Sequence, residues 1–131
     1  MSVLDEYIRE LQTDTALDEF TMKDVQMKLP GIKHKWTGRL VRCKIDIAKL
    51  KRKRSQTIDR LTDKLIERSP VRMSVPVAKQ KVQTLEEVID LNDEIEDMKL
   101  SLEFCEKAER ILNSMTFDIK NLTEIIKLET Q

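Results

Sequence analysis

Apolar residues recur every three or four positions along most of the chain, which is the spacing of an amphipathic helix. From Ile32 to about Arg68 only Gly38 argues against helix. The apolar positions of this stretch are Trp36, Leu40, Cys43, Ile47 and Leu50, followed by Ile58, Leu61 and Leu65. Alternating steps of four and three are typical of a coiled-coil seam. We therefore expect a long helix over about 32–68, with a seam that is either wet or shifted in register where Arg54 and Thr57 interrupt the pattern.

A second long helix is predicted over about 84–129, because Thr84 and Glu87 have the spacing of a capping box. Its apolar seam comprises Val88, Leu91, Ile95, Met98, Leu102, Cys105, Ala108, Leu112, Met115, Ile119, Leu122 and Ile126. Further apolar residues beside the seam give a stripe that suits a bundle or a closed ring of helices better than a simple dimer. The residues predicted to join copies of the chain are Leu91, Ile95, Met98, Leu102, Cys105, Leu112, Met115, Ile119, Leu122 and Ile126.

Shorter elements precede and separate the two long helices. Ser2 has the position of a helix cap, with Asp5 at its capping-box partner position. Residues 12–21 are expected to connect this helix to another short one, which Pro30-Gly31 would end, because proline lacks a backbone donor and glycine permits a sharp turn. We predict an N-terminal helical region over 1–68, a linker over 69–83 and C-terminal oligomerisation helices over 84–131.

Composition supports an all-α fold. The chain has only two glycines and three prolines, 4% aromatic residues and 37% charged residues. Few turn residues among many helix formers favour long helices over a sheet. Helices this polar bury little by themselves and usually complete their burial against copies of themselves. We therefore predict a homo-oligomeric helical bundle or ring with coiled-coil-like packing of the C-terminal helices.

The chain shows no targeting or membrane signal. No stretch approaches the ~20 apolar residues that a membrane span needs, and the acidic N-terminus lacks the apolar core of a signal peptide. Cys43 and Cys105 share no metal-binding or redox spacing, so they are interpreted as buried reduced thiols. These features predict a cytoplasmic protein that no membrane-spanning segment anchors.

Charge is segregated along the chain although the net charge is zero. Residues 1–22 sum to −5, residues 23–81 to +13 and residues 82–131 to −8. A chain that separates its charges in this way offers a middle segment suited to anions.

The cations of the first long helix share one face. Lys35, Arg39, Arg42, Lys49, Lys53, Arg60 and Lys64 are separated by steps of three, four or seven residues, and Lys51, Arg52 and Arg54 extend the run. Repulsion among like charges on one face costs stability, which favours an external polyanion as partner. Two alternatives remain open: a solvated face neutralised by the acidic helix of a neighbour, and binding to a membrane surface. Trp36 could stack a base, although its seam position favours the core.

Sequence motifs for catalysis are absent. The chain has no P-loop, no glycine-rich nucleotide loop and no cluster of metal ligands, and its one histidine, His34, is more often a surface residue than a base. We therefore expect no enzyme activity, no metal and no cofactor.

In several short motifs the sequence resembles the UvsY-type recombination mediators of T-even-like phages. The motifs, in order, are Leu4-Asp5, Glu10-Leu11, Lys35-Trp36, Arg60-Leu61, Leu102-Glu103-Phe104-Cys105 and Phe117-x-Ile119-Lys120. The resemblance implies a ring-like homo-oligomer that binds single-stranded DNA and loads a RecA-like recombinase onto strands covered by a single-strand-binding protein.

The resemblance also bears on the DNA contact. The family's DNA-contact motif has a lysine two residues before the arginine that matches Arg60, whereas this chain has Ile58 at that position. The resemblance therefore supports Arg60 alone, and the run from Lys49 to Arg54 is a candidate to compensate. The rival interpretation is a coiled-coil scaffold or assembly chaperone whose basic helix pairs with an acidic protein.

Overall fold

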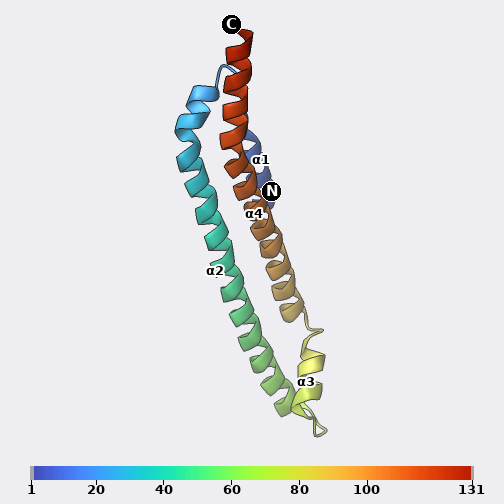
Figure 1. Cartoon of the computed structure of the whole chain (residues 1–131). Helices are drawn as coiled ribbons and strands as arrows, with labels where there is room; N and C mark the ends of the chain where they lie inside the picture. The colour runs from blue at the N-terminus through green and yellow to red at the C-terminus, as the bar shows by residue number, and fades with distance from the viewer. Residues whose placement is uncertain (1, 131) are drawn as a thin grey trace. The chain divides into compact units, whose positions relative to one another are not determined.

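Four helices account for nearly all of residues 2–130, the part of the chain that the computed structural model describes (Figure 1). They are α1 (Val3–Asp14), α2 (Met22–Arg68), α3 (Val75–Val82) and α4 (Glu86–Glu129). No strand occurs between residues 2 and 130. The predicted all-α class with long helices is confirmed, and the homo-oligomeric bundle or ring stays a prediction.

The first helix starts where the sequence predicts. The Ser2 hydroxyl accepts a hydrogen bond from the Asp5 backbone N–H at 3.1 Å and donates one to the Asp5 carboxylate at 2.8 Å. This interaction satisfies one of the backbone donors that a helix start leaves without an internal partner. Among the residues of α1, Leu11 is buried and Tyr7 is half-buried.

The predicted helix end at Pro30-Gly31 is wrong, because α2 continues through both residues. An internal proline loses one backbone hydrogen bond and costs a helix about 3 kcal/mol. Leu29 and Trp36 are buried on either side of this point, and their packing offsets the local cost. Neither glycine of the chain has a positive φ, so Gly31 is an ordinary helical residue here.

The predicted linker over 69–83 contains a short helix, α3. Ser74 caps it by accepting a hydrogen bond from the Val77 N–H, and Pro76 occupies its first turn, where a missing N–H is tolerated. The capping box predicted at Thr84 does not form, because the Thr84 hydroxyl donates to the Lys81 carbonyl and α4 begins at Glu86. The division into regions 1–68, 69–83 and 84–131 stays a prediction about function.

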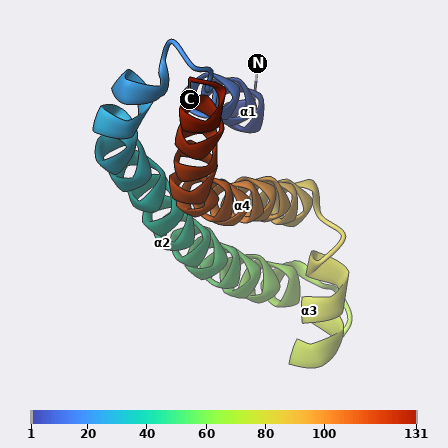
Figure 2. The ribbon, with the colours of Figure 1, turned by 45° about the horizontal axis from the view of Figure 1, so that its top comes forward.

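Contacts within the chain define two compact units, and both long helices contribute to each. Unit 1 combines the chain up to Cys43 with the chain from Leu100 onward, and unit 2 is Lys44–Lys99. In unit 1 the start of α2 and the end of α4 run side by side in opposite directions, with α1 beside α4 (Figures 1 and 2). Trp36 of α2 is fully buried in this unit with Cys105 and Leu112 of α4.

Unit 2 has a smaller core that includes polar side chains. Ala78 and Val82 of α3 are fully buried with Val88 and Ile95 of α4. On α2, Thr57 and Thr62 are buried as well, and the Thr62 hydroxyl has no hydrogen-bond partner. Near Thr57 the buried positions of α2 are thus Thr57 and Thr62, one residue away from the predicted seam residues Ile58 and Leu61, which are half-buried.

The α4 seam lies largely inside the chain's own core. Of the residues predicted to join copies, the buried ones are Leu91, Ile95, Cys105, Leu112, Met115 and Ile119, and the half-buried ones are Met98, Leu102, Leu122 and Ile126. A side chain buried against its own chain is not available to a second copy in this conformation. The oligomerisation role of these ten residues stays a prediction, and their direct contribution here is to the intramolecular core.

Candidate nucleic-acid interface

The predicted cationic face is carried by α2, which is helical throughout the basic segment. Within unit 2, at about 100° per residue, Lys49, Lys53, Arg60 and Lys64 fall within an arc of about 60°. This arc lies roughly 90° to one side of the buried residues Ile47 and Thr57. Lys44 and Lys51 lie at a similar angle on the other side of that buried line.

In unit 1 the first two cations of this face are already paired with acids of α1. The Lys35 ammonium lies 2.6 Å from an Asp14 carboxylate oxygen and 3.3 Å from Glu10, and the Arg39 guanidinium lies 2.7 Å from Glu10. The bond from Arg39 is the main reason why the pKa of Glu10 is lowered from its ordinary value. Helix α1 therefore neutralises Lys35 and Arg39 within the chain.

Aromatic packing holds the same cluster together. The Arg39 guanidinium carbon lies 4.6 Å from the centre of the Tyr7 ring and 4.8 Å from that of Trp36, which are cation–π distances. Trp36 also contacts Tyr7 and Phe104 edge to face, and its indole N–H donates to Asp14 at 2.9 Å. Because Trp36 is 0% exposed, it belongs to the core and is not placed to stack a DNA base.

In unit 2 two predicted site residues contact α4. Arg54 is half-buried and donates a hydrogen bond to the Asn92 side chain at 2.9 Å. Arg60 lies 2.5 Å from Glu87, and both side chains are about half exposed. Exposed ion pairs of this kind contribute only ~0–1 kcal/mol, so a phosphate can compete with Glu87 for Arg60.

The remaining predicted cations are exposed, and no acid of residues 2–130 pairs with them. They are Arg42 in unit 1 and Lys49, Lys51, Arg52, Lys53 and Lys64 in unit 2. Lys44, which is not among the predicted site residues, is exposed and unpaired in the same way. The signal that identifies Lys44 is its step of seven residues to Lys51, which places the two on a common flank of α2.

Acids are concentrated on the neighbouring stretch of α4. Residues 86–99 carry seven acidic residues and one lysine. Only Glu87 and Glu96 of these acids have a salt-bridge partner in the described chain. Unit 2 therefore presents unpaired cations on α2 and unpaired carboxylates on α4, so the segregation of charge in the sequence persists in the fold.

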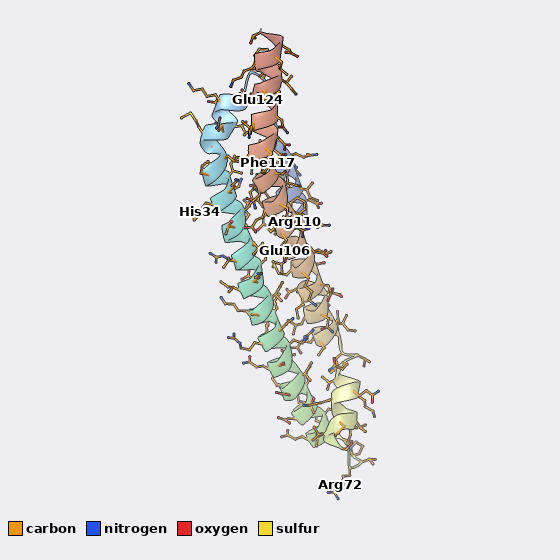
Figure 3. The ribbon with its side chains drawn as sticks, in the orientation of Figure 1. His34, Arg72, Glu106, Arg110, Phe117 and Glu124 are labelled. Carbon is orange, nitrogen blue, oxygen red and sulfur yellow. The ribbon has the colours of Figure 1, made fainter. Side chains whose placement is uncertain are left out.

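Metal-ligand clusters, thiols and membrane-spanning helices are the further features that could indicate a function among residues 2–130. No group of three or more potential ligands is placed to hold a metal ion, and His34 is exposed on α2 (Figure 3). Cys43 and Cys105 are buried and form no disulfide, as predicted, and burial raises the pKa of the Cys105 thiol to about 12. No helix between residues 2 and 130 has the length and apolar character to span a membrane.

Comparisons with known proteins place the chain among recombination proteins. The model of the family described as "Recombination, repair and ssDNA binding protein UvsY" matches residues 10–130. Three similar solved structures are crystal forms of the bacteriophage T4 recombination mediator protein UvsY, with TM-scores of 0.82, 0.81 and 0.80.

The likeness to these structures extends over the whole fold despite low identity. Their identity to this chain is 16%, 17% and 17%, and they cover 98%, 100% and 95% of it. In turn, 99%, 99% and 98% of each T4 chain is covered. A search of curated proteins found no match.

Proposed function

Since the chain belongs to the UvsY family of recombination, repair and single-stranded-DNA-binding proteins, we propose that it is a non-enzymatic recombination mediator. In this proposal it binds single-stranded DNA through the exposed cations of α2. It then promotes loading of a RecA-like recombinase onto strands covered by a single-strand-binding protein.

The observation that carries the proposal is the group of unpaired cations on α2 in unit 2. Lys49, Lys53 and Lys64 share one flank of the helix, and Arg60 lies among them in a weak surface pair. Helix-borne cations without carboxylate partners are suited to phosphates. Because no exposed aromatic residue accompanies them on α2, binding relies on phosphate contacts and is strongly salt-dependent.

The pairing of Lys35 and Arg39 with α1 limits the proposed interface. Both cations already have carboxylate partners in unit 1, and the Arg39 side chain is only 24% exposed. Releasing them would break three ion pairs and the stacking of Arg39 on Tyr7 and Trp36. We therefore assign the DNA contact to the flank of α2 that carries Lys49, Lys53, Arg60 and Lys64 in unit 2.

Self-association multiplies this weak contact. Several copies on one assembly raise the overall affinity for a strand without any new contact. We propose that the copies meet through exposed apolar residues of α4, because the seam residues are occupied inside the chain. Leu100, Ile111 and Ile125 are all at least 44% exposed and lie within an arc of about 40° on the side of α4 opposite Cys105.

The mediator step follows from holding the strand at its phosphates. Bases of a strand bound in this way stay accessible, so a recombinase can engage them while a competing single-strand-binding protein is displaced. No residue of this chain has to form or break a covalent bond in that process.

Two measurements test the proposal. Fluorescence anisotropy of labelled oligothymidine, measured at a series of salt concentrations, gives the affinity. The slope of log affinity against log salt concentration should be about −0.7 for each phosphate contact. ATP hydrolysis by a RecA-like recombinase should rise when the protein is added to single strands already covered by a single-strand-binding protein. Absence of salt-dependent DNA binding would exclude the site, and DNA binding without any stimulation would exclude the mediator role.

The unpaired acids of α4 favour one alternative, a scaffold whose basic helix pairs with an acidic protein or with α4 of another copy. The contact between Arg60 and Glu87 illustrates such pairing within one chain. Competition with polyglutamate separates the two functions. A scaffold would prefer polyglutamate to oligothymidine of equal charge, whereas a DNA-binding protein would show the opposite preference.

A further inference from the structure

The end of unit 2 around α3 has a composition unlike the rest of the chain. Residues 68–85 contain four cations and no acidic residue. The cations, all exposed, are Arg68, Arg72, Lys79 and Lys81. Figure 3 shows Arg72 in the turn between α2 and α3, with its side chain extending away from both helices. We refer to residues 68–85 as the α3 tip.

Apolar side chains are exposed among these cations. Val71, Val75, Val77 and Leu85 are between 43% and 73% exposed. These four residues do not belong to the core, because the buried side of α3 is formed by Ala78 and Val82, which are 0% exposed. Exposed apolar side chains that cluster in this way mark interaction sites more often than scattered ones do.

The apolar and cationic positions alternate in a regular arrangement. Val75 precedes Lys79 by four residues, and Val77 precedes Lys81 by four, so each valine lies one turn before a lysine on its own flank of α3. In the turn before α3, Val71 and Arg72 are adjacent. In each of these three pairs an apolar side chain lies beside a positive charge.

The cations of the tip are largely available. Lys79 lies 3.9 Å from Asp59, a long contact between two side chains that are at least half exposed. Arg68, Arg72 and Lys81 have no ion pair with any of residues 2–130. The tip therefore combines positive charge and apolar surface with little internal compensation for either.

We propose that the α3 tip is a docking surface for an acidic protein segment in which aspartate or glutamate residues alternate with aliphatic ones. Charge complementarity requires an anionic partner, and the exposed valines require apolar side chains at similar spacing. Residues 68–85 contain no aromatic ring, so nucleic-acid bases would find no stacking platform there. This inference goes beyond the DNA-binding proposal and does not depend on it.

The test uses the full chain and a defined peptide. A fluorescein-labelled peptide of alternating aspartate and leucine should bind, whereas peptides with asparagine for aspartate or serine for leucine should bind much less. The double variant Arg72→Gln with Lys81→Gln removes two unpaired charges of the tip. It should weaken peptide binding by about fivefold, the effect expected for two exposed ion pairs.

A matched control removes equal charge elsewhere. Lys120→Gln with Lys127→Gln alters two exposed lysines of α4 in unit 1 and should leave peptide affinity unchanged. Val71→Ser tests the apolar component, because Val71 is 73% exposed and its loss does not affect the core. Circular dichroism should show native helicity for all three variants.

Three outcomes would overturn the proposal. Equal loss of peptide binding in the tip variant and in the control would indicate only non-specific attraction. Loss of oligothymidine binding in the tip variant, without loss of peptide binding, would assign the tip to the DNA site. Binding of phosphatidylglycerol vesicles that depends on Arg72 and Lys81, with no peptide binding, would assign it to a membrane surface.

Discussion

Two pairs of lysines on α2 allow the DNA interface to be tested with matched charge. Lys49 and Lys53 are one helical turn apart on the flank that also carries Arg60, and both are exposed without an acidic partner. Lys44 and Lys51 are two turns apart on the other flank and are equally exposed. Replacing either pair by alanine removes two charges from the same helix, and alanine preserves helix propensity.

The expected magnitude follows from the phosphates that the first pair would contact. If each lysine meets one phosphate, the double variant loses about 1.4 from the slope of log affinity against log salt. If the variant and the unmodified protein bind equally at 1 M salt, this change in slope lowers the affinity for DNA roughly tenfold near 0.15 M salt, or by about 1.5 kcal/mol. The Lys44→Ala with Lys51→Ala control loses only general attraction, and we expect less than about a threefold change.

The assay is anisotropy of labelled oligothymidine with each variant at several salt concentrations. Circular dichroism and light scattering confirm that both variants keep their helices and their assembly state. Equal losses for the two pairs, or an unchanged salt slope for Lys49→Ala with Lys53→Ala, would refute the assignment of DNA to this flank.

Three further predictions concern assembly and stability. Ile111→Glu should disperse the oligomer, as measured by light scattering, and leave helicity unchanged. Leu112→Asp, at a fully buried position, should instead unfold unit 1. An intact assembly in Ile111→Glu would exclude the exposed apolar residues of α4 as the contact between copies. Thr62→Val removes a buried hydroxyl without a partner and should raise the free energy of unfolding by about 1 kcal/mol. A lower midpoint of thermal unfolding in this variant would contradict the prediction. The pKa of Glu10 is lowered in the folded state by Arg39, so its contribution is present above pH 4.5 and is lost as pH falls below that value. Glu10→Gln should therefore reduce stability in urea at neutral pH and make little difference at acidic pH, and a constant difference would argue against the pair.

Local periodicity predicted most of the two long helices, but it missed α3 and ended a separate short helix at Pro30-Gly31, where α2 is continuous. The spacing of apolar residues predicted helices over about 32–68 and 84–129, and Ser2 marked the start of α1. Pro30 was misread as a helix end because its local penalty is visible in the sequence, whereas the burial of Leu29 and Trp36 that offsets it is not.

The candidate site, too, could be predicted from the sequence only in part. The sequence places the cations of α2 on one face, but it does not reveal that Glu10 and Asp14 neutralise Lys35 and Arg39 from a helix more than twenty residues away. Likewise, an apolar seam has the same pattern whether it packs within a chain or between copies. Leu112 and the other buried seam residues contribute to the core of their own chain, and their role in assembly stays a prediction.

Direct mapping of the bound strand tests the central claim most closely. Oligothymidine carrying photoreactive bases can be crosslinked to the full chain and the modified peptides identified by mass spectrometry. We predict crosslinks concentrated on α2 between Lys49 and Lys64, with few on α1 and on α4. Crosslinks concentrated on α4, or on the segment around Lys35 that α1 covers, would show that α2 is not the main DNA contact.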